Sequence, residues 1–101
     1  MVKKKLNYYV YMLECSDHSL YTGYSPYLEK RIALHQEGKA AKYTRSRRPV
    51  KLVHFWTFTS KSQALQVEAF IKKRKRTEKL AFISTCISED ELLKRVEEQK
   101  K

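Results

Sequence analysis

The chain has 101 residues, of which 42% are hydrophobic, and it contains only two glycines and two prolines. These values fit one folded domain and exclude a low-complexity or collagen-like chain. The net charge of +11 favours a polyanionic partner, nucleic acid first and an acidic membrane surface well behind it. A merely basic or ribosome-associated surface is the alternative.

The N-terminal lysines resemble the start of a secretory signal, but the apolar run after them is short and ends at Glu14. No stretch reaches the roughly 18 apolar residues of a membrane-spanning helix. We therefore expect a soluble, cytoplasmic protein. Cys15 and Cys86 are far apart and lack metal-ligand spacing, which favours free thiols over a zinc site.

A β-hairpin is expected first in the chain. Residues 7–15 are rich in tyrosine and valine, residues 16–19 are typical of a turn, and residues 20–25 form a second strand-like run. Tyr9, Tyr11 and Leu13 then share one face of the first strand. Gly23 falls inside the second strand, where a glycine indicates a bulge or a close approach to the backbone.

The rest of the chain predicts one more strand and several helices. Ser25 is expected to cap a helix that begins at Pro26 and ends at Gly38. The basic residues 39–49 are expected to form a loop, and residues 50–59 a third strand.

Three helices are expected after this strand. Ser60 or Ser62 starts a long one that extends to residue 76, and Thr77 caps a second through residue 85. Ser88, three residues before Glu91, opens a third through a capping box. Its apolar residues Leu92, Leu93 and Val96 could dock it on the core.

The element order is therefore β-β-α-β-α-α-α, and the predicted fold class is α+β, a small three-stranded antiparallel sheet flanked by helices. We expect a single domain over residues 1–101, with its core at about residues 8–79 and a helical extension at about residues 80–101.

Two triplets stand on the hairpin strands, YVY at residues 9–11 and YTG at residues 21–23. Arg31 and His35 follow on the first helix, and Glu68 on the helix after the third strand. This order resembles the GIY-YIG nuclease superfamily over about residues 8–79. The segment AKYTRSRRPVKLV and the small size resemble its bacterial single-domain group (YhbQ/YazA-like, UPF0213).

The resemblance implies a metal-dependent endonuclease that hydrolyses DNA phosphodiester bonds, in repair or recombination. The implied catalytic residues are Tyr11, Tyr21, Arg31, His35 and Glu68. A free tyrosine has a pKa near 10, so Tyr11 needs cations or a metal-bound water to become a base, and Arg31 is expected to lower its pKa. Arg31 and His35 stand one helical turn apart and face the same side. Arg31 and Tyr21 would hold the phosphate, and His35 would assist Tyr11.

Glu68 is the expected ligand of one divalent ion, Mg²⁺ or Mn²⁺, since magnesium often uses a single carboxylate, several waters and the substrate phosphate. The alternative is an ordinary ion pair with Lys72, one helical turn further on.

Two basic stretches are expected to contact the phosphate backbone, GKAAKYTRSRRP at residues 38–49 and KKRKR at residues 72–76. Tyr43 is a candidate for base stacking. The expected nucleic-acid-binding residues are Lys39, Lys42, Tyr43, Arg45, Arg47, Arg48, Lys72 and Lys73.

The sequence departs from the superfamily pattern at several positions. Tyr9 replaces a glycine and Thr22 an isoleucine. Tyr24 stands where excision-repair relatives place a lysine, and no asparagine follows Glu68. Without room for a separate DNA-binding domain, we expect low sequence specificity on branched or single-stranded DNA, or targeting by a protein partner. A catalytically weak or inactive nucleic-acid-binding or adaptor module is the main alternative, and a structural basic protein of an RNA assembly is a third.

Overall fold

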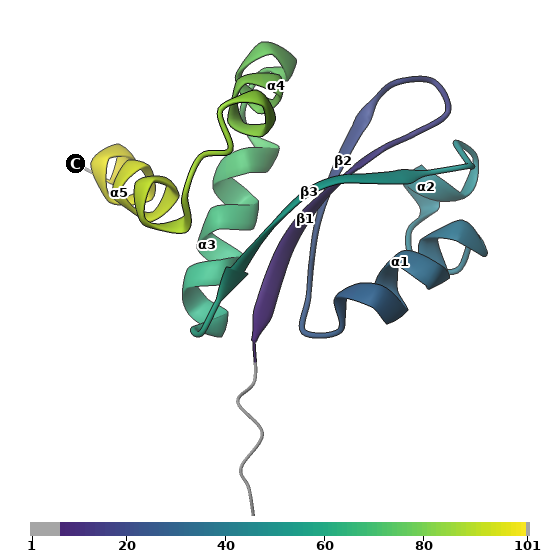
Figure 1. The fold of residues 1–101 in the computed structure, drawn as a ribbon, viewed down its shortest axis with the longest axis horizontal. Coiled ribbons are helices and arrows are strands. Elements are labelled where there is room, and N and C mark those ends of the chain that lie inside the picture. Colours follow the sequence, from purple (N-terminus) through teal and green to yellow (C-terminus); the bar gives the residue numbers. More distant parts are fainter. Residues whose placement is uncertain (1–6, 101) are drawn as a thin grey trace, which may run out of the picture.

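The computed structural model describes residues 7–100. Three strands and five helices follow one another along the chain (Figure 1). Their bounds are β1 Tyr8–Glu14, β2 Leu20–Ser25, α1 Leu28–Gln36, α2 Lys42–Arg45, β3 Lys51–Phe58, α3 Lys61–Lys72, α4 Arg76–Ser84 and α5 Glu89–Gln99. The predicted α+β class and order are confirmed, with the short helix α2 as an addition.

The three strands form one antiparallel sheet in the order β2-β1-β3. Tyr11 is opposite Gly23 on β2 and Phe55 on β3. The pairing of β1 with β3 shifts by one residue between Met12 and Leu13, which is the mark of a β-bulge. β1 is thus the central strand, and both of its faces are covered by helices.

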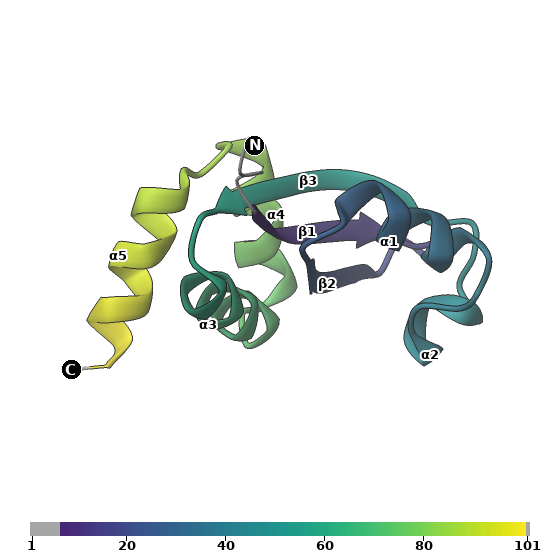
Figure 2. The ribbon, with the colours of Figure 1, turned by 90° about the horizontal axis from the view of Figure 1, so that it is seen from below.

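Each face of the sheet carries its own hydrophobic cluster. Val10, Met12 and Trp56 are buried under α3, α4 and α5, where Val67 and Ile71 of α3 pack against the strands. Figures 1 and 2 show α3 and α1 on opposite sides of the sheet. Burying one large aliphatic side chain contributes about 1.5–3 kcal/mol, so this larger cluster is the main source of stability.

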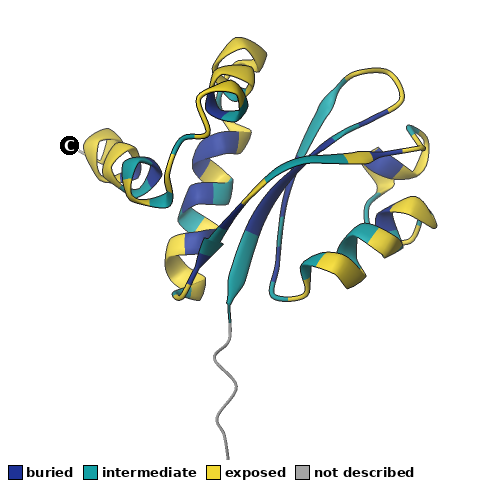
Figure 3. Ribbon diagram, in the orientation of Figure 1, coloured by how far each residue is buried: buried dark blue, intermediate teal, exposed yellow. Residues whose placement is uncertain are grey.

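The smaller cluster lies on the α1 side. Tyr11, Leu13, Cys15 and Val50 are buried there, and half-buried residues pack around them, among them Leu28 and Ile32 of α1 and Tyr21 of β2. The buried residue of α1 itself is a histidine, His35. Figure 3 shows the buried part of α1 at the end where the helix meets α2. A polar group in this position needs partners.

Several helix ends differ from the prediction. Ser25 does not cap α1, because its hydroxyl accepts the Tyr27 backbone N–H at 3.0 Å in a turn before the helix, and Tyr27 occupies the cap position. Gly38, with φ 77°, follows the cap residue Glu37 and ends α1 as expected.

The later helices show the same kind of difference. Ser60 caps α3 and Ser88 caps α5 through bonds from the backbone N–H of Gln63 and Glu91, as their sequences predict. The expected helix over residues 60–76 ends at Lys72, and the next begins at Arg76 with Lys75 as its cap instead of Thr77. A short turn therefore separates α3 from α4.

No helix between residues 7 and 100 combines the length and the apolar character needed to cross a bilayer.

Candidate active site

Tyr11, His35 and Thr44 form a hydrogen-bonded chain in the α1-side core. The Tyr11 hydroxyl lies 2.7 Å from His35 Nε2, and His35 Nδ1 lies 2.8 Å from the Thr44 hydroxyl oxygen. All three side chains are buried. Three segments that are distant in the sequence, β1, α1 and α2, therefore meet through one line of polar atoms.

The direction of these hydrogen bonds follows from the bond that Thr44 makes to the backbone. The Thr44 hydroxyl donates to the Ala41 carbonyl at 3.2 Å, so its oxygen is free to accept the proton of His35 Nδ1. In the neutral ring, Nε2 then carries the lone pair and accepts the hydrogen of Tyr11. The geometry thus selects one tautomer of His35. Thr44 was not among the residues predicted from the sequence, although it lies within the segment AKYTRSRRPVKLV.

Burial sets the protonation states of this pair. The pKa of His35 is lowered, first by burial and second by the nearby Arg31 guanidinium. The pKa of Tyr11 is raised, chiefly by burial and by Tyr21. Arg31 lowers the pKa of Tyr11, as expected from the sequence, but desolvation raises it more and outweighs this effect. At neutral pH both groups are uncharged.

The glycine of the second triplet makes room for the tyrosine of the first. A Cβ placed on Gly23 would lie 3.0 Å from Tyr11 Cε2 and would clash still more with its Cζ and hydroxyl. The Tyr11 ring therefore crosses β2 directly over the Gly23 Cα and carries its hydroxyl toward the free edge of the sheet. The close approach predicted at this glycine is made by Tyr11 itself.

Tyr21 stands beside this chain. Its ring lies 5.1 Å from the His35 ring and 6.5 Å from the Tyr11 ring, between centroids. The Tyr43 ring of α2 stacks on it at 5.9 Å, and the Arg47 guanidinium lies 3.9 Å from the Tyr43 centroid. The two motif tyrosines thus converge, as the hairpin predicts.

Arg31 and Glu68 complete the predicted set without touching the chain. Arg31 is half-buried and lies one turn before His35 on α1. It acts on the pKa of both Tyr11 and His35. Glu68, on α3, raises the pKa of Tyr11 and Tyr24 as a weaker cause. Figure 2 shows α3 and α2 flanking the β2 edge. The two faces of the sheet, one covered by α3 and the other by α1, therefore meet at this edge.

Glu68 pairs with Lys72, as one of the two alternatives predicts. The two groups lie 3.3 Å apart, and the Glu68 side chain is only 18% exposed. Between residues 7 and 100, no cluster of three or more histidine, cysteine or acidic side chains could hold a metal ion. A single hard carboxylate suits Mg²⁺ that keeps its waters, and it does not suit zinc.

The two basic stretches meet at the hairpin turn. Arg47 pairs with Asp17 at 3.1 Å, and Arg76 donates to the His18 carbonyl at 2.7 Å. The turn of the hairpin therefore holds one basic segment on each side of β2. Positive charge thus flanks the edge at which Tyr21 lies.

The predicted nucleic-acid-binding residues differ in how free their charges are. Arg47 is tied to Asp17 and to the Tyr43 carbonyl, and Arg48 donates to the carbonyls of Arg45 and Gln36. Their guanidinium groups hold the loop together. The other charged candidates are exposed, with Lys39 near Glu37 and Lys72 paired to Glu68; they are Lys39, Lys42, Arg45, Lys72 and Lys73.

Gln36 joins the end of α1 to the start of β3. Its side-chain amide donates to the Val50 carbonyl and accepts the Val50 backbone N–H at 3.1 Å. The amide thus pairs with the backbone as a neighbouring strand would. His35, the preceding residue on the helix, is held in place by these bonds of its neighbour as well as by the bonds of its own ring nitrogens.

The sequence and the structure resemble known proteins. The family model for the GIY-YIG catalytic domain matches residues 7–98. The UPF0213 protein SpyM50708 of Streptococcus pyogenes serotype M5 (strain Manfredo) is 55% identical over 78 residues, which cover 76% of this chain and 85% of that protein.

Two solution NMR structures share the fold. The UPF0213 protein BH0048 from Bacillus halodurans is 46% identical, with a TM-score of 0.55, over 79% of this chain and 85% of its own. The protein EF2693 from E. faecalis is 39% identical, with a TM-score of 0.57, over 84% and 90%. The chain therefore belongs to the GIY-YIG family, a nuclease superfamily, and within it to the UPF0213 group.

Proposed function

We propose that this protein is a divalent-metal-dependent endonuclease that hydrolyses DNA phosphodiester bonds at the β2 edge. The observation that supports it best is the buried chain from Tyr11 through His35 to Thr44. A neutral phenol bonded to the lone pair of a neutral imidazole is arranged for proton transfer. The flanking basic segments favour a polyanionic substrate.

The proposed proton path starts at the attacking water. Tyr11 is too weak an acid in this site to exist as a free phenolate, so it cannot act as a preformed base. It would accept the proton of water while it gives its own to His35 Nε2. The carbonyl-anchored Thr44 hydroxyl keeps accepting from Nδ1–H as the ring becomes charged.

The phosphate would be held from the same side. Arg31 offers a guanidinium with several donors in a fixed plane, one turn from His35. The Tyr21 hydroxyl is the second proposed contact. Together they would stabilise the charge that develops on the phosphoryl oxygens.

Glu68 is the residue that would hold Mg²⁺ or Mn²⁺, once its carboxylate leaves Lys72. The ion would supply a Lewis acid for the phosphoryl oxygen and the leaving group when bound. Because the ion pair is a single contact with a half-exposed lysine, separating it costs little, on the order of 0.5 kcal/mol. Lys72 would then be free for a neighbouring phosphate.

Cleavage assays test this proposal. Supercoiled plasmid, branched DNA and single-stranded DNA are incubated with Mg²⁺, Mn²⁺ or chelator. We expect metal-dependent cutting that Tyr11→Phe and Glu68→Gln each reduce by at least a hundredfold. Tyr8→Phe and Glu78→Gln are matched controls, on the same strand and on an exposed helix. Cutting that survives both site substitutions would refute the assigned site.

The second candidate is a binding or adaptor module without turnover. The Glu68–Lys72 pair and the Tyr43 ring stacked on Tyr21 favour it, because both occupy groups that catalysis needs. Salt-sensitive DNA binding with no metal-dependent cutting of any substrate would support this alternative. A role in repair or recombination, with a protein partner for targeting, is part of the nuclease proposal.

A further inference from the structure

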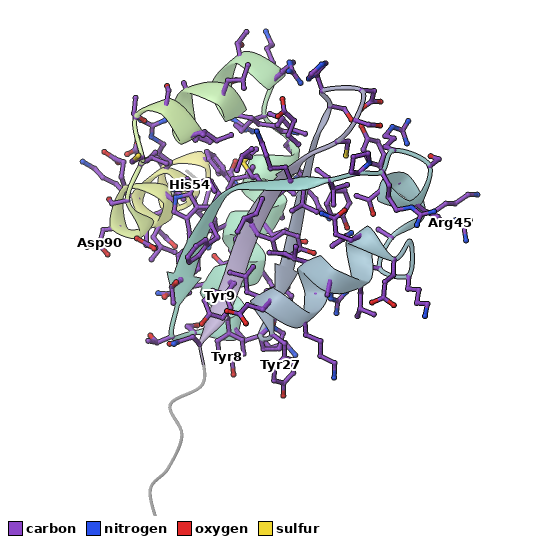
Figure 4. The ribbon with its side chains drawn as sticks, turned by 45° about the vertical axis from the view of Figure 1, so that its right-hand side comes forward. Tyr8, Tyr9, Tyr27, Arg45, His54 and Asp90 are labelled. Atoms are coloured by element: carbon purple, nitrogen blue, oxygen red, sulfur yellow. The ribbon has the colours of Figure 1, made fainter. Side chains whose placement is uncertain are left out.

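An aromatic groove lies at the start of α1, on the same side of the sheet as the tyrosine–histidine chain. It has a volume of about 620 Å³. Its aromatic walls are Tyr9 of β1, Tyr27 before α1, and Phe55 of β3. Figure 4 shows Tyr9 and Tyr27 near each other where β1 and α1 begin, and Arg45 at a distance, beyond the other end of α1.

The rings of this groove are unusually exposed. Tyr27 is 63% and Phe55 is 44% exposed. Tyr9 meets Phe55 edge to face, with centroids 6.1 Å apart. Only one other large aromatic side chain in residues 7–100 is exposed, and it is Tyr43, which stacks on Tyr21. Exposed aromatic surface of this kind indicates a binding site.

The charge of the protein as a whole fits a nucleic acid strand. Lys30 and Glu29 both line the groove, so its own charges balance and the attraction for phosphates comes from the rest of the chain. Asn7 also lines the groove. The net charge of +11 favours a polyanionic strand over a neutral or basic ligand.

We infer that this groove binds the unpaired bases of a DNA strand that passes through the proposed active site. In a duplex the faces of the bases are already stacked on one another. Exposed aromatic side chains therefore suit unpaired bases, whose faces are free to stack on them. Along α1, the distance from the groove to His35 is about 10 Å. A stacked DNA strand would span this distance with about three nucleotides. This inference rests on the proposed function and names its substrate class, single-stranded or frayed DNA.

Binding without cutting separates this inference from the proposed function. Fluorescence anisotropy in chelator compares a labelled thymidine oligonucleotide of about ten nucleotides with an abasic strand of equal length, which keeps the phosphates and lacks the bases. We expect the wild-type protein to bind the thymidine strand more tightly. Tyr27→Ala and Phe55→Ala should each weaken that binding about fivefold or more and leave abasic binding unchanged.

Matched variants make the result specific. Leu65→Ala removes a 40% exposed side chain from α3, on the opposite face, and should change neither affinity. Tyr27→Leu and Phe55→Leu keep apolar area without a stacking ring and should behave as the alanine variants do. Equal binding of the two strands by the wild type, or an unchanged ratio in the ring variants, would overturn the inference even if plasmid cutting is observed. A base-dependent affinity in a protein that cuts no DNA would support the groove and refute the nuclease.

Discussion

The Tyr11 hydroxyl donates to Nε2 of His35 across 2.7 Å, in a core where both side chains are almost fully shielded from water. Tyr11→Phe removes the donor and leaves a buried ring nitrogen without a partner. We expect the free energy of unfolding to fall by about 1–3 kcal/mol, measured by urea denaturation. Tyr8→Phe, on the same strand, should cost less than half as much. Equal costs would show that the bond contributes nothing special.

Thr44 is expected to position His35 without contacting substrate. Thr44→Val keeps the shape and removes the acceptor of Nδ1–H, whereas Thr44→Ser keeps the hydroxyl. The valine variant should lower kcat about tenfold or more with little change in KM, and ¹⁵N NMR should show that His35 no longer favours the Nδ1–H tautomer. The serine variant should restore both. A normal tautomer in the valine variant would contradict the assignment.

The lowered pKa of His35 predicts a loss of stability on mild acidification. The unfolded chain takes up the histidine proton near pH 6.5, whereas the folded protein resists it until a lower pH. Between these two values the unfolded state binds more protons, so stability rises with pH. It is fully present above about pH 6.5 and is lost as the pH falls toward the folded pKa.

Denaturation at pH 7.5 and pH 5.5 measures this effect. His35→Gln should flatten the pH dependence, whatever its absolute stability. The pKa of Asp17 is lowered by its bonds from Ser19, so this carboxyl titrates below the measured window. An unchanged slope in His35→Gln would place the titrating group elsewhere.

The crossing of Tyr11 over Gly23 predicts a coupling between the two positions. Gly23→Ala forces the Tyr11 ring to move, and such overpacking costs about 1–3 kcal/mol. In a Tyr11→Leu background the same change should cost at least 0.5 kcal/mol less. A double-mutant cycle from chemical denaturation gives the difference. Additive effects would mean that the ring does not restrict residue 23.

The sequence predicted the parts of this fold that rest on local chemistry. The tyrosine- and valine-rich residues 8–14 and the turn residues after them predict the hairpin, and Ser60 and Ser88 cap their helices through bonds within four residues. It failed at Ser25, where a serine before a proline formed a turn, and at residues 42–45, whose short helix is held by tertiary contacts.

The candidate site divides in the same way. Spacing brought Tyr11, Tyr21 and His35 together correctly. It could not show Thr44, because nothing local distinguishes a threonine that meets a histidine ring from one in solvent. Nor could it show that Tyr11 is desolvated, since the pKa of a phenol depends on what packs around it. The catalytic roles of all five residues stay predictions: Tyr11, Tyr21, Arg31, His35 and Glu68.

The amide of Gln36 and the ring of His35 together determine where this chain can change length. His35 reaches forward to Thr44, and Gln36 reaches further, to Val50. These two contacts close overlapping loops, which share residues 37–43. Loop closure depends only weakly on length, so added residues between Gly38 and Ala40 would lengthen a segment that both contacts enclose. An insertion between Thr44 and Val50 would instead lengthen only the Gln36–Val50 loop and change the position of α2 relative to β3, and with it the contact of His35.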